Sequence, residues 1–234
     1  MSSVRSLAPK AAFLFCLLVF FSSVIAQNPR MVLPIGHTDA VTSASFSPGG
    51  KFILSTSKDA TARIWDAEKG FLLLTLNRHK DMVFYAEYDP QGKHIATASG
   101  DHTSIIWDAI SGKMLFELKG HTKPVIFNSF SPDGKKLATA SWDSTVRIWE
   151  TSTGKLLNTV KGSGTVFWDS SGKKIVTLAG REILVYDALS GKLTHKLIGH
   201  KRSLVSARFN HDGSKVLSSS WDKTAALWDL NSDT

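Results

Sequence analysis

The sequence predicts an all-β fold built from five copies of one four-stranded unit. A short motif with an aromatic residue recurs at a nearly constant spacing along most of the chain. Between these motifs lie short runs rich in Val, Ile, Thr and aromatic residues, separated by turns that contain Gly, Pro and Asp, which is the composition of strands and hairpins. No run shows a helical apolar period long enough to compete with this interpretation.

The recurring motif ends in an aromatic residue followed by an acid. The five aromatic residues, Trp65, Trp107, Trp149, Tyr186 and Trp228, are spaced by 42, 42, 37 and 42 residues. Upstream, four of the five copies contain a His, usually after Gly, at positions 37, 79, 121 and 200. A fixed period of this length indicates a repeat architecture. We place the repeats at about residues 36–77, 78–119, 120–161, 162–198 and 199–230.

Each copy contains four candidate strands. In the third copy, an apolar run over Lys135–Ser141 is followed by a tight turn with Asp143 and then by the segment that carries Trp149. A further run, Lys155–Val160, follows a Gly turn, and the segment before the Pro-Asp-Gly turn supplies one more strand. Five such units fill residues 30–230, and we treat that segment as one domain.

Units of about 42 residues that open with Gly-His and end with Trp-Asp resemble the WD40-repeat family. The resemblance implies a β-propeller of five four-stranded blades, in which the segment Arg30–Ile35 adds the outer strand of the last blade and closes the ring. An incomplete arc, finished by another copy of the chain, and a fragment of a larger propeller are the alternatives. With the N-terminal segment described below, the resemblance indicates a secreted, bacterial type of this family.

The repeated polar residues have a structural explanation. In the resembled family, a Trp, a hydroxyl, a His and an Asp form a hydrogen-bonded chain inside each blade. The order suits the groups, because an indole N–H only donates and a carboxylate only accepts. The positions that match are His37, Ser55, Asp59, Trp65; His79, Thr97, Asp101, Trp107; His121, Thr139, Asp143, Trp149; and His200, Ser218, Asp222, Trp228.

A catalytic interpretation of the same residues is less favourable. A hydrolase needs one Ser-His-Asp set in one pocket, whereas this chain repeats the set four times and has no Gly-x-Ser-x-Gly motif. No His or Cys spacing typical of a zinc site is present. We therefore expect no enzyme, no catalytic residue, no metal and no cofactor.

The fourth repeat departs from the pattern. It has Gly162-Ser163 where the others have a His, its tight turn at residues 179–182 lacks Asp, and Tyr186 replaces Trp. This copy therefore lacks the groups needed for the hydrogen-bonded chain.

Residues 1–26 have the features of a secretory signal peptide. Arg5 and Lys10 precede an uncharged apolar stretch at residues 11–25, and small residues lead to a cleavage site after Ala26. The alternative is an uncleaved membrane anchor, but the apolar part falls short of the ~20 residues of a spanning helix. We expect a secreted or periplasmic protein without stable membrane insertion after cleavage. Cys16, the single cysteine, would leave with the signal peptide.

The expected function is that of a non-catalytic scaffold that binds other proteins. The resemblance places a binding face at the loops after each Gly-His and at the residues beside each tight-turn Asp. Tryptophans surrounded by cations favour a protein partner, which the positive charge would steer if it is acidic. The net charge of +8 is scattered and not in a run, so nucleic acid is not expected. The candidate residues are Lys58, Lys80, Lys123, Trp142, Lys201, Arg202, Trp221 and Lys223.

Two other functions remain as alternatives. One is a propeller enzyme, similar to a hydrolase or lactonase, with a metal in its channel. The other is a regulatory propeller that belongs to a larger polypeptide.

Overall fold

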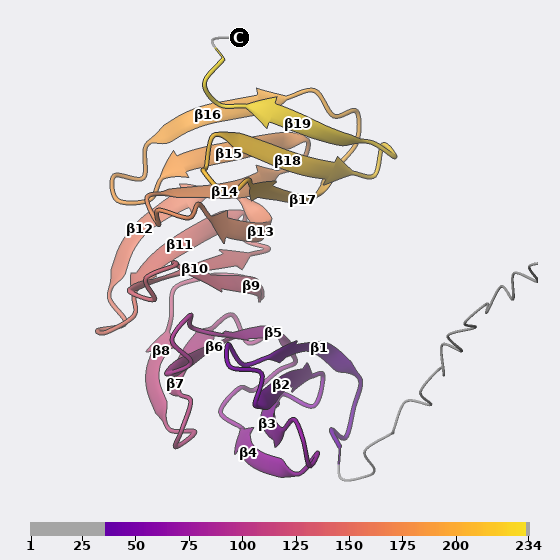
Figure 1. Ribbon diagram of the computed structural model, residues 1–234, viewed down its shortest axis with the longest axis vertical. Helices are drawn as coiled ribbons and strands as arrows, with labels where there is room; N and C mark the ends of the chain where they lie inside the picture. Colours follow the sequence, from indigo (N-terminus) through magenta and orange to yellow (C-terminus); the bar gives the residue numbers. More distant parts are fainter. Residues whose placement is uncertain (1–35, 233–234) are drawn as a thin grey trace, which may run out of the picture. The chain divides into compact units, whose positions relative to one another are not determined.

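The computed structural model describes residues 36–232, and these residues form strands and no helix. The 19 strands make five antiparallel sheets that follow one another along the chain (Figure 1). The all-β fold and its division into repeated sheets are confirmed. No helix in this part of the chain is long and apolar enough to cross a membrane.

Four of the sheets have four strands, numbered from the innermost outwards. Sheet 1 contains β1 (Val41–Phe46), β2 (Phe52–Ser57), β3 (Ala62–Asp66) and β4 (Leu72–Leu76). Sheet 2 contains β5 (Val83–Tyr88), β6 (His94–Ser99), β7 (Ser104–Asp108) and β8 (Met114–Leu118). Sheet 3 contains β9 (Val125–Phe130), β10 (Lys136–Ser141), β11 (Thr145–Glu150) and β12 (Leu156–Lys161). Sheet 4 contains β13 (Ser163–Trp168), β14 (Lys174–Ala179), β15 (Glu182–Asp187) and β16 (Leu193–Ile198).

Sheet 5 has three described strands: β17 (Leu204–Phe209), β18 (Lys215–Ser220) and β19 (Ala225–Asp229). The segment predicted to add its fourth strand, Arg30–Ile35, lies outside the described residues, as does the predicted signal peptide.

The tight turn between the second and third strands has the same local cause in each sheet with a turn Asp. In sheet 3, Asp143 Oδ1 accepts a hydrogen bond from the N–H of Thr145 at 2.9 Å. Ser144 takes a positive φ of 66°, and the N–H of Ser144 donates to Ser141 O at 3.2 Å. Asp is suited to this position because its side chain bonds backbone groups two residues ahead. The turn leaves Trp142 at the tip of the hairpin.

Successive sheets pack face to face near their innermost strands. β1 contacts β5, β5 contacts β9, β9 contacts β13, and β13 contacts β17. Each interface between neighbouring sheets contains its own buried apolar cluster. Since a sheet must bury an apolar face against another element, this series of interfaces forms the core.

The two faces of each sheet carry different residues. One face has an aliphatic pair, formed by cross-strand partners on the second and third strands. The opposite face has an aromatic row, such as Phe130, Leu137 and Trp149 in sheet 3. In all four interfaces, the aliphatic pair of one sheet packs against the aromatic row of the next sheet. The packed aliphatic pairs are Leu54–Ile64, Ala96–Ile106, Ala138–Ile148 and Val176–Val185, each residue no more than 2% exposed.

Candidate functional site

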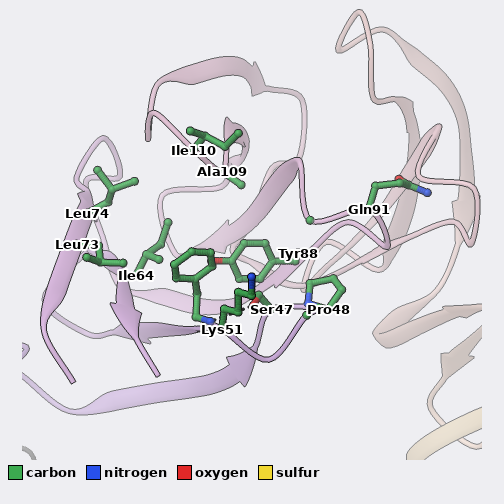
Figure 2. Close-up of a pocket in the computed structure, with 13 residues that line it drawn as sticks. Ser47, Pro48, Lys51, Ile64, Leu73, Leu74, Tyr88, Gln91, Ala109 and Ile110 are labelled. Carbon is green, nitrogen blue, oxygen red and sulfur yellow. Dashed lines mark hydrogen bonds between the residues drawn. The ribbon is translucent and has the colours of Figure 1, made fainter. Parts of the chain in front are cut away.

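A pocket of about 480 Å³ lies between sheets 1 and 2 and is lined mainly by apolar side chains (Figure 2). Phe52 and Leu74 come from sheet 1, and Ile110 follows the third strand of sheet 2. The Tyr88 hydroxyl is buried there without a hydrogen-bond partner, and burial raises the pKa of Tyr88 to about 12. None of the sequence-predicted site residues lines this pocket, which lies at the ends of β1 and β5 remote from the tight turns.

The residues expected to form hydrogen-bonded chains do lie together, in four separate sets. In sheet 3, Trp149 Nε1 donates to Thr139 Oγ1 at 2.9 Å. The same hydroxyl lies 2.9 Å from His121 Nε2, and His121 Nδ1 lies 2.8 Å from Asp143 Oδ2. The hydrogen-bonded chain therefore starts at Trp149 on the third strand and passes through Thr139 on the second strand. It then passes through His121 in the loop before the first strand and ends at Asp143 in the tight turn.

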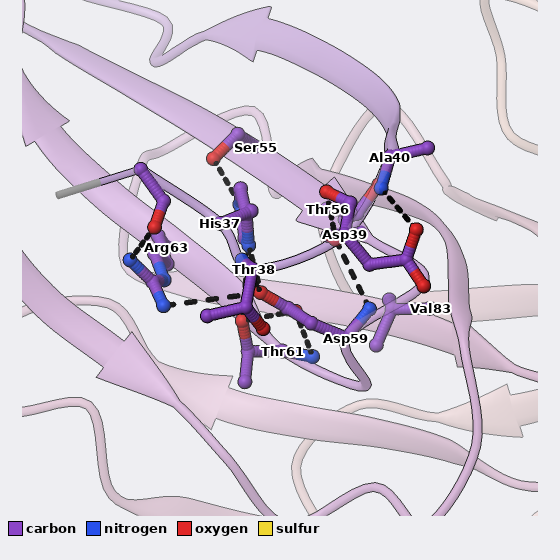
Figure 3. A network of polar contacts seen from close by, with 12 residues as sticks. His37, Thr38, Asp39, Ala40, Ser55, Thr56, Asp59, Thr61, Arg63 and Val83 are labelled. Atoms are coloured by element: carbon purple, nitrogen blue, oxygen red, sulfur yellow. Dashed lines mark hydrogen bonds and ion pairs between the residues drawn. The ribbon is translucent and has the colours of Figure 1, made fainter. Parts of the chain in front are cut away.

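The other three sets repeat this geometry closely. In sheet 1, shown in Figure 3, His37 joins Ser55 at 2.8 Å to Asp59 at 2.9 Å. In the three sets outside sheet 3, the indole-to-hydroxyl distances lie between 2.8 and 2.9 Å. The sets comprise His37, Ser55, Asp59 and Trp65; His79, Thr97, Asp101 and Trp107; and His200, Ser218, Asp222 and Trp228.

The charge state of the set in sheet 3 follows from its surroundings. Burial lowers the pKa of His121, against the opposing effect of Asp143, and favours a neutral imidazole. Burial also acts to raise the pKa of Asp143, but hydrogen bonds from Thr145, His121 and Thr122 outweigh it and lower that pKa to about 2. The neutral ring thus donates its Nδ1–H to an ionised carboxylate and accepts the Thr139 hydroxyl proton at Nε2. Every group in the chain is then satisfied.

Sequence reasoning missed one more hydroxyl in each set. The Thr two residues after each turn Asp donates its side-chain hydroxyl to that Asp at 2.5–2.7 Å. The constant offset from Asp in the repeats is a signal that would have identified it. These residues are Thr61, Thr103, Thr145 and Thr224.

The hydrogen-bonded sets also hold the loops that follow each His. Asp101 Oδ2 accepts the backbone N–H of Lys80 at 3.0 Å, and Asp222 Oδ2 accepts that of Lys201 at 2.9 Å. Thr38 and Thr122 are held in the same way by Asp59 and Asp143. A buried set therefore fixes the backbone from which an exposed lysine projects.

The predicted partner-binding residues lie on one surface, which we call the turn face. In sheets 1, 3 and 5, the residue before the turn Asp donates its N–H to the residue that precedes the innermost strand: Lys58 to Ala40 O, Trp142 to Pro124 O and Trp221 to Ser203 O, at 2.9–3.0 Å. The turns and the preceding loops thus lie at the same end of the innermost strands. All eight predicted residues are exposed there: Lys58, Lys80, Lys123, Trp142, Lys201, Arg202, Trp221 and Lys223.

The two tryptophans of the turn face are unusually accessible for their size. Trp142 is 53% exposed and Trp221 is 68% exposed. The Trp142 ring meets Phe84 of sheet 2 edge to face, with 5.5 Å between the ring centroids. This contact restrains the indole and leaves much of its surface to solvent.

A second feature that sequence reasoning missed is an aromatic cluster on the innermost strands. The ring of Phe127 stacks on Tyr85 at 4.4 Å and meets Phe167 at 5.2 Å, and the Arg208 guanidinium lies 4.0 Å above the Phe167 ring. Burial raises the pKa of Glu87, on the same strand as Tyr85, to about 8. These positions differ from copy to copy, so the repeat gives no signal for them.

In the part of the chain that the structure describes, no three His, Cys, Asp or Glu side chains form a group that could hold a metal ion.

Replacing Thr139 by Val should lower the free energy of unfolding by about 2–4 kcal/mol, because Val cannot bond the buried Trp149 indole or His121 ring. Thr177 occupies the equivalent register position in sheet 4, where its hydroxyl bonds only Thr165 O. Thr177→Val should therefore lower the free energy of unfolding by less than Thr139→Val does. Urea unfolding of both variants measures the difference, and equal losses would show that the hydrogen-bonded chain contributes nothing specific.

The stability of the protein should fall on acidification in two stages. Because the folded state lowers the pKa of His121 from its ordinary 6.5, the unfolded chain takes up protons first and stability decreases from about pH 6.5 downwards. The Asp143 contribution is complete above its ordinary pKa of 3.8 and is lost as pH approaches its folded pKa of about 2. Urea unfolding across this range measures both stages, and Asp143→Asn should weaken the second. Constant stability from pH 7 to pH 5 would contradict the first.

Comparison with known proteins agrees with this geometry. The family model "WD domain, G-beta repeat" matches residues 28–66, 70–108, 112–150 and 191–229. The unmatched stretch 151–190 contains Gly162-Ser163 and the tight turn without Asp of the fourth repeat. "Periodic tryptophan protein 2 homolog" of Schizosaccharomyces pombe is 41% identical over 49 residues, which are 21% of this chain and 6% of that protein. "Probable cytosolic iron-sulfur protein assembly protein Ciao1" of Culex quinquefasciatus is 45% identical over 42 residues, 18% of this chain and 12% of that protein.

"Uncharacterized WD repeat-containing protein sll1491" of Synechocystis sp. is 42% identical over 53 residues, 22% of this chain and 15% of that protein. The matched stretches thus span only 6–15% of the lengths of these relatives. The family model, in contrast, covers more than half of the chain. The four matched segments, together with the four hydrogen-bonded sets, place this protein in the WD40-repeat family.

Proposed function

We propose that this protein is an exported, non-catalytic scaffold that binds an acidic protein partner through the turn face. The observation that carries the proposal is the exposure of Trp142 and Trp221 among six cations on a surface whose loop backbone is held by hydrogen bonds to the turn Asp side chains. WD40 repeats generally mediate contacts between proteins, which supports a binding function for this chain.

The charges of the turn face suit a partner of opposite sign. The ion pairs that involve lysine in the described residues use Lys119, Lys196 and Lys215, and none of the six cations of the turn face is among them. Cations without an ion pair attract an acidic surface at long range and raise the rate of association. The indoles supply the apolar contact area that charge alone does not, and Trp is enriched among residues that dominate binding energy.

The hydrogen-bonded sets favour binding over catalysis. Each buried His donates to a carboxylate and accepts from a hydroxyl, so its ring nitrogens are already occupied. A ring in this arrangement stabilises the loop geometry and has no free nitrogen to act as a base towards a substrate. The same bonds hold the loop backbone before binding, which reduces the entropy lost when a partner docks.

A Trp142→Ala/Trp221→Ala double variant should lose most of its affinity for the partner, at least about a hundredfold, because both apolar anchors are removed. Affinity capture from the extracytoplasmic fraction, with the wild type as reference, identifies proteins that depend on these side chains. Phe71 and Leu189 are 67% and 79% exposed but lie at turns between third and fourth strands, away from the turn face. Their double alanine variant is the matched control and should retain the partner.

The affinity of the captured partner should also fall steeply with added salt, and more so for wild type than for a Lys80→Glu/Lys201→Glu variant. A partner that binds the double tryptophan variant as tightly as the wild type would place the binding surface elsewhere.

Export is supported by residues 1–26, whose charge and apolar pattern is that of a signal peptide. The intact mass of the protein recovered outside the cytoplasm should correspond to a chain that begins at Gln27. A full-length mass, or recovery only from the cytoplasm, would contradict the export proposal and leave the turn-face proposal to be judged by the binding experiment.

A further inference from the structure

Sheet 5 presents an aliphatic pair that none of the other four sheets in residues 36–232 covers. Leu217 and Leu227 are cross-strand partners on β18 and β19, in the register of the aliphatic pairs of sheets 1 to 4. The residues of those four pairs are 0–2% exposed, whereas Leu217 is 56% and Leu227 is 65% exposed. The two leucines are of the residue type found in the buried interfaces, but this pair has no covering sheet among the described residues.

Sheet 1 presents the opposite half of the same kind of interface. Its aromatic row consists of Phe46, Ile53 and Trp65, joined by cross-strand pairing in the same way as the rows of the later sheets. Phe46 is 67% exposed, while its counterpart in sheet 3, Phe130, is 6% exposed. Trp65 is also more exposed than Trp107 and Trp149, which are 2% and 3% exposed.

The aliphatic pair of sheet 5 and the aromatic row of sheet 1 are complementary in the same way as the faces that meet in the four observed interfaces. In each of those, an aliphatic pair lies against the aromatic row of the next sheet. Among the described residues, the pair of sheet 5 and the row of sheet 1 are the two members without a counterpart. In the structure of residues 36–232 they do not pack together, since β17 and β1 lack the interface that joins the innermost strands of successive sheets.

We propose that a second copy of this chain covers these faces, with the aliphatic pair of sheet 5 in one copy packed on the aromatic row of sheet 1 in the other. A contact between two different faces of identical chains is heterologous, and two copies can make it twice and satisfy all four faces. The contact would continue the interface already repeated within the chain. Burial of Leu217, Leu227 and Phe46, which are 56%, 65% and 67% exposed in the single chain, would remove their apolar surface from water.

The test is the oligomeric state of the protein in a dilution series, followed by light scattering or sedimentation. The wild type should self-associate, and Leu227→Glu and Phe46→Glu should each weaken association by roughly a hundredfold, because a charge would be buried against an apolar face. The two variants mixed in equal amounts should form heterodimers, since one intact row can still meet one intact pair. Leu189→Glu, at a site 79% exposed in the turn between β15 and β16, should associate as the wild type does.

Three results would overturn the proposal. One is a wild type that stays monomeric over the whole series, and another is unchanged association of both variants. The third is a monomeric wild type whose melting temperature drops in Leu227→Glu and Phe46→Glu, which would show that the two ends of a single chain cover each other. Circular dichroism of each variant shows whether it is folded, which is expected because Leu227 and Phe46 are exposed in the single chain.

Discussion

A buried hydroxyl that links an indole to an imidazole is the contact on which each sheet with a turn Asp depends. In sheet 3, Thr139 receives the Trp149 N–H and bonds His121, whose other nitrogen bonds Asp143. The contact joins two strands, a loop and a tight turn that are separated in sequence by up to 28 residues. Because the groups are buried, loss of one member leaves the others unpaired at a high cost. The sheet geometry and the loop geometry are therefore coupled.

This coupling explains how a structural device supports the proposed binding surface. The carboxylate that ends each chain of hydrogen bonds also accepts the N–H of the next loop residue, such as Lys80 or Lys201. The exposed cations and the two tryptophans consequently project from a backbone that is fixed before any partner arrives. Repetition of His, Ser or Thr, and Asp thus holds the loops of the turn face in four sheets in the same way.

Sheet 4 shows that packing can replace the hydrogen-bonded chain. It lacks the His and the turn Asp of the hydrogen-bonded set, yet it buries Val176, Ile183 and Val185 completely and places Thr177 where the other sheets have the linking hydroxyl. Sheets 1 and 5 show the reverse condition, since both have the hydrogen-bonded chain but each leaves one apolar face uncovered. Packing between sheets and hydrogen bonds within a sheet therefore stabilise the fold independently. Only the packing determines which side chains a neighbouring sheet must present.

The sequence by itself determined the all-β repeat and the members of each hydrogen-bonded set, because those features recur at fixed offsets within one copy. The Thr that completes each set, for example Thr145, follows the same offset and was overlooked. Tertiary structure alone decided the features that join different copies: the Tyr85, Phe127 and Phe167 cluster with Arg208, the support of Trp142 by Phe84, and the exposure of Leu227 and Phe46. The physical reason is that the burial of a side chain depends on the sheet packed against it. The sequence of one repeat does not indicate whether such a sheet is present.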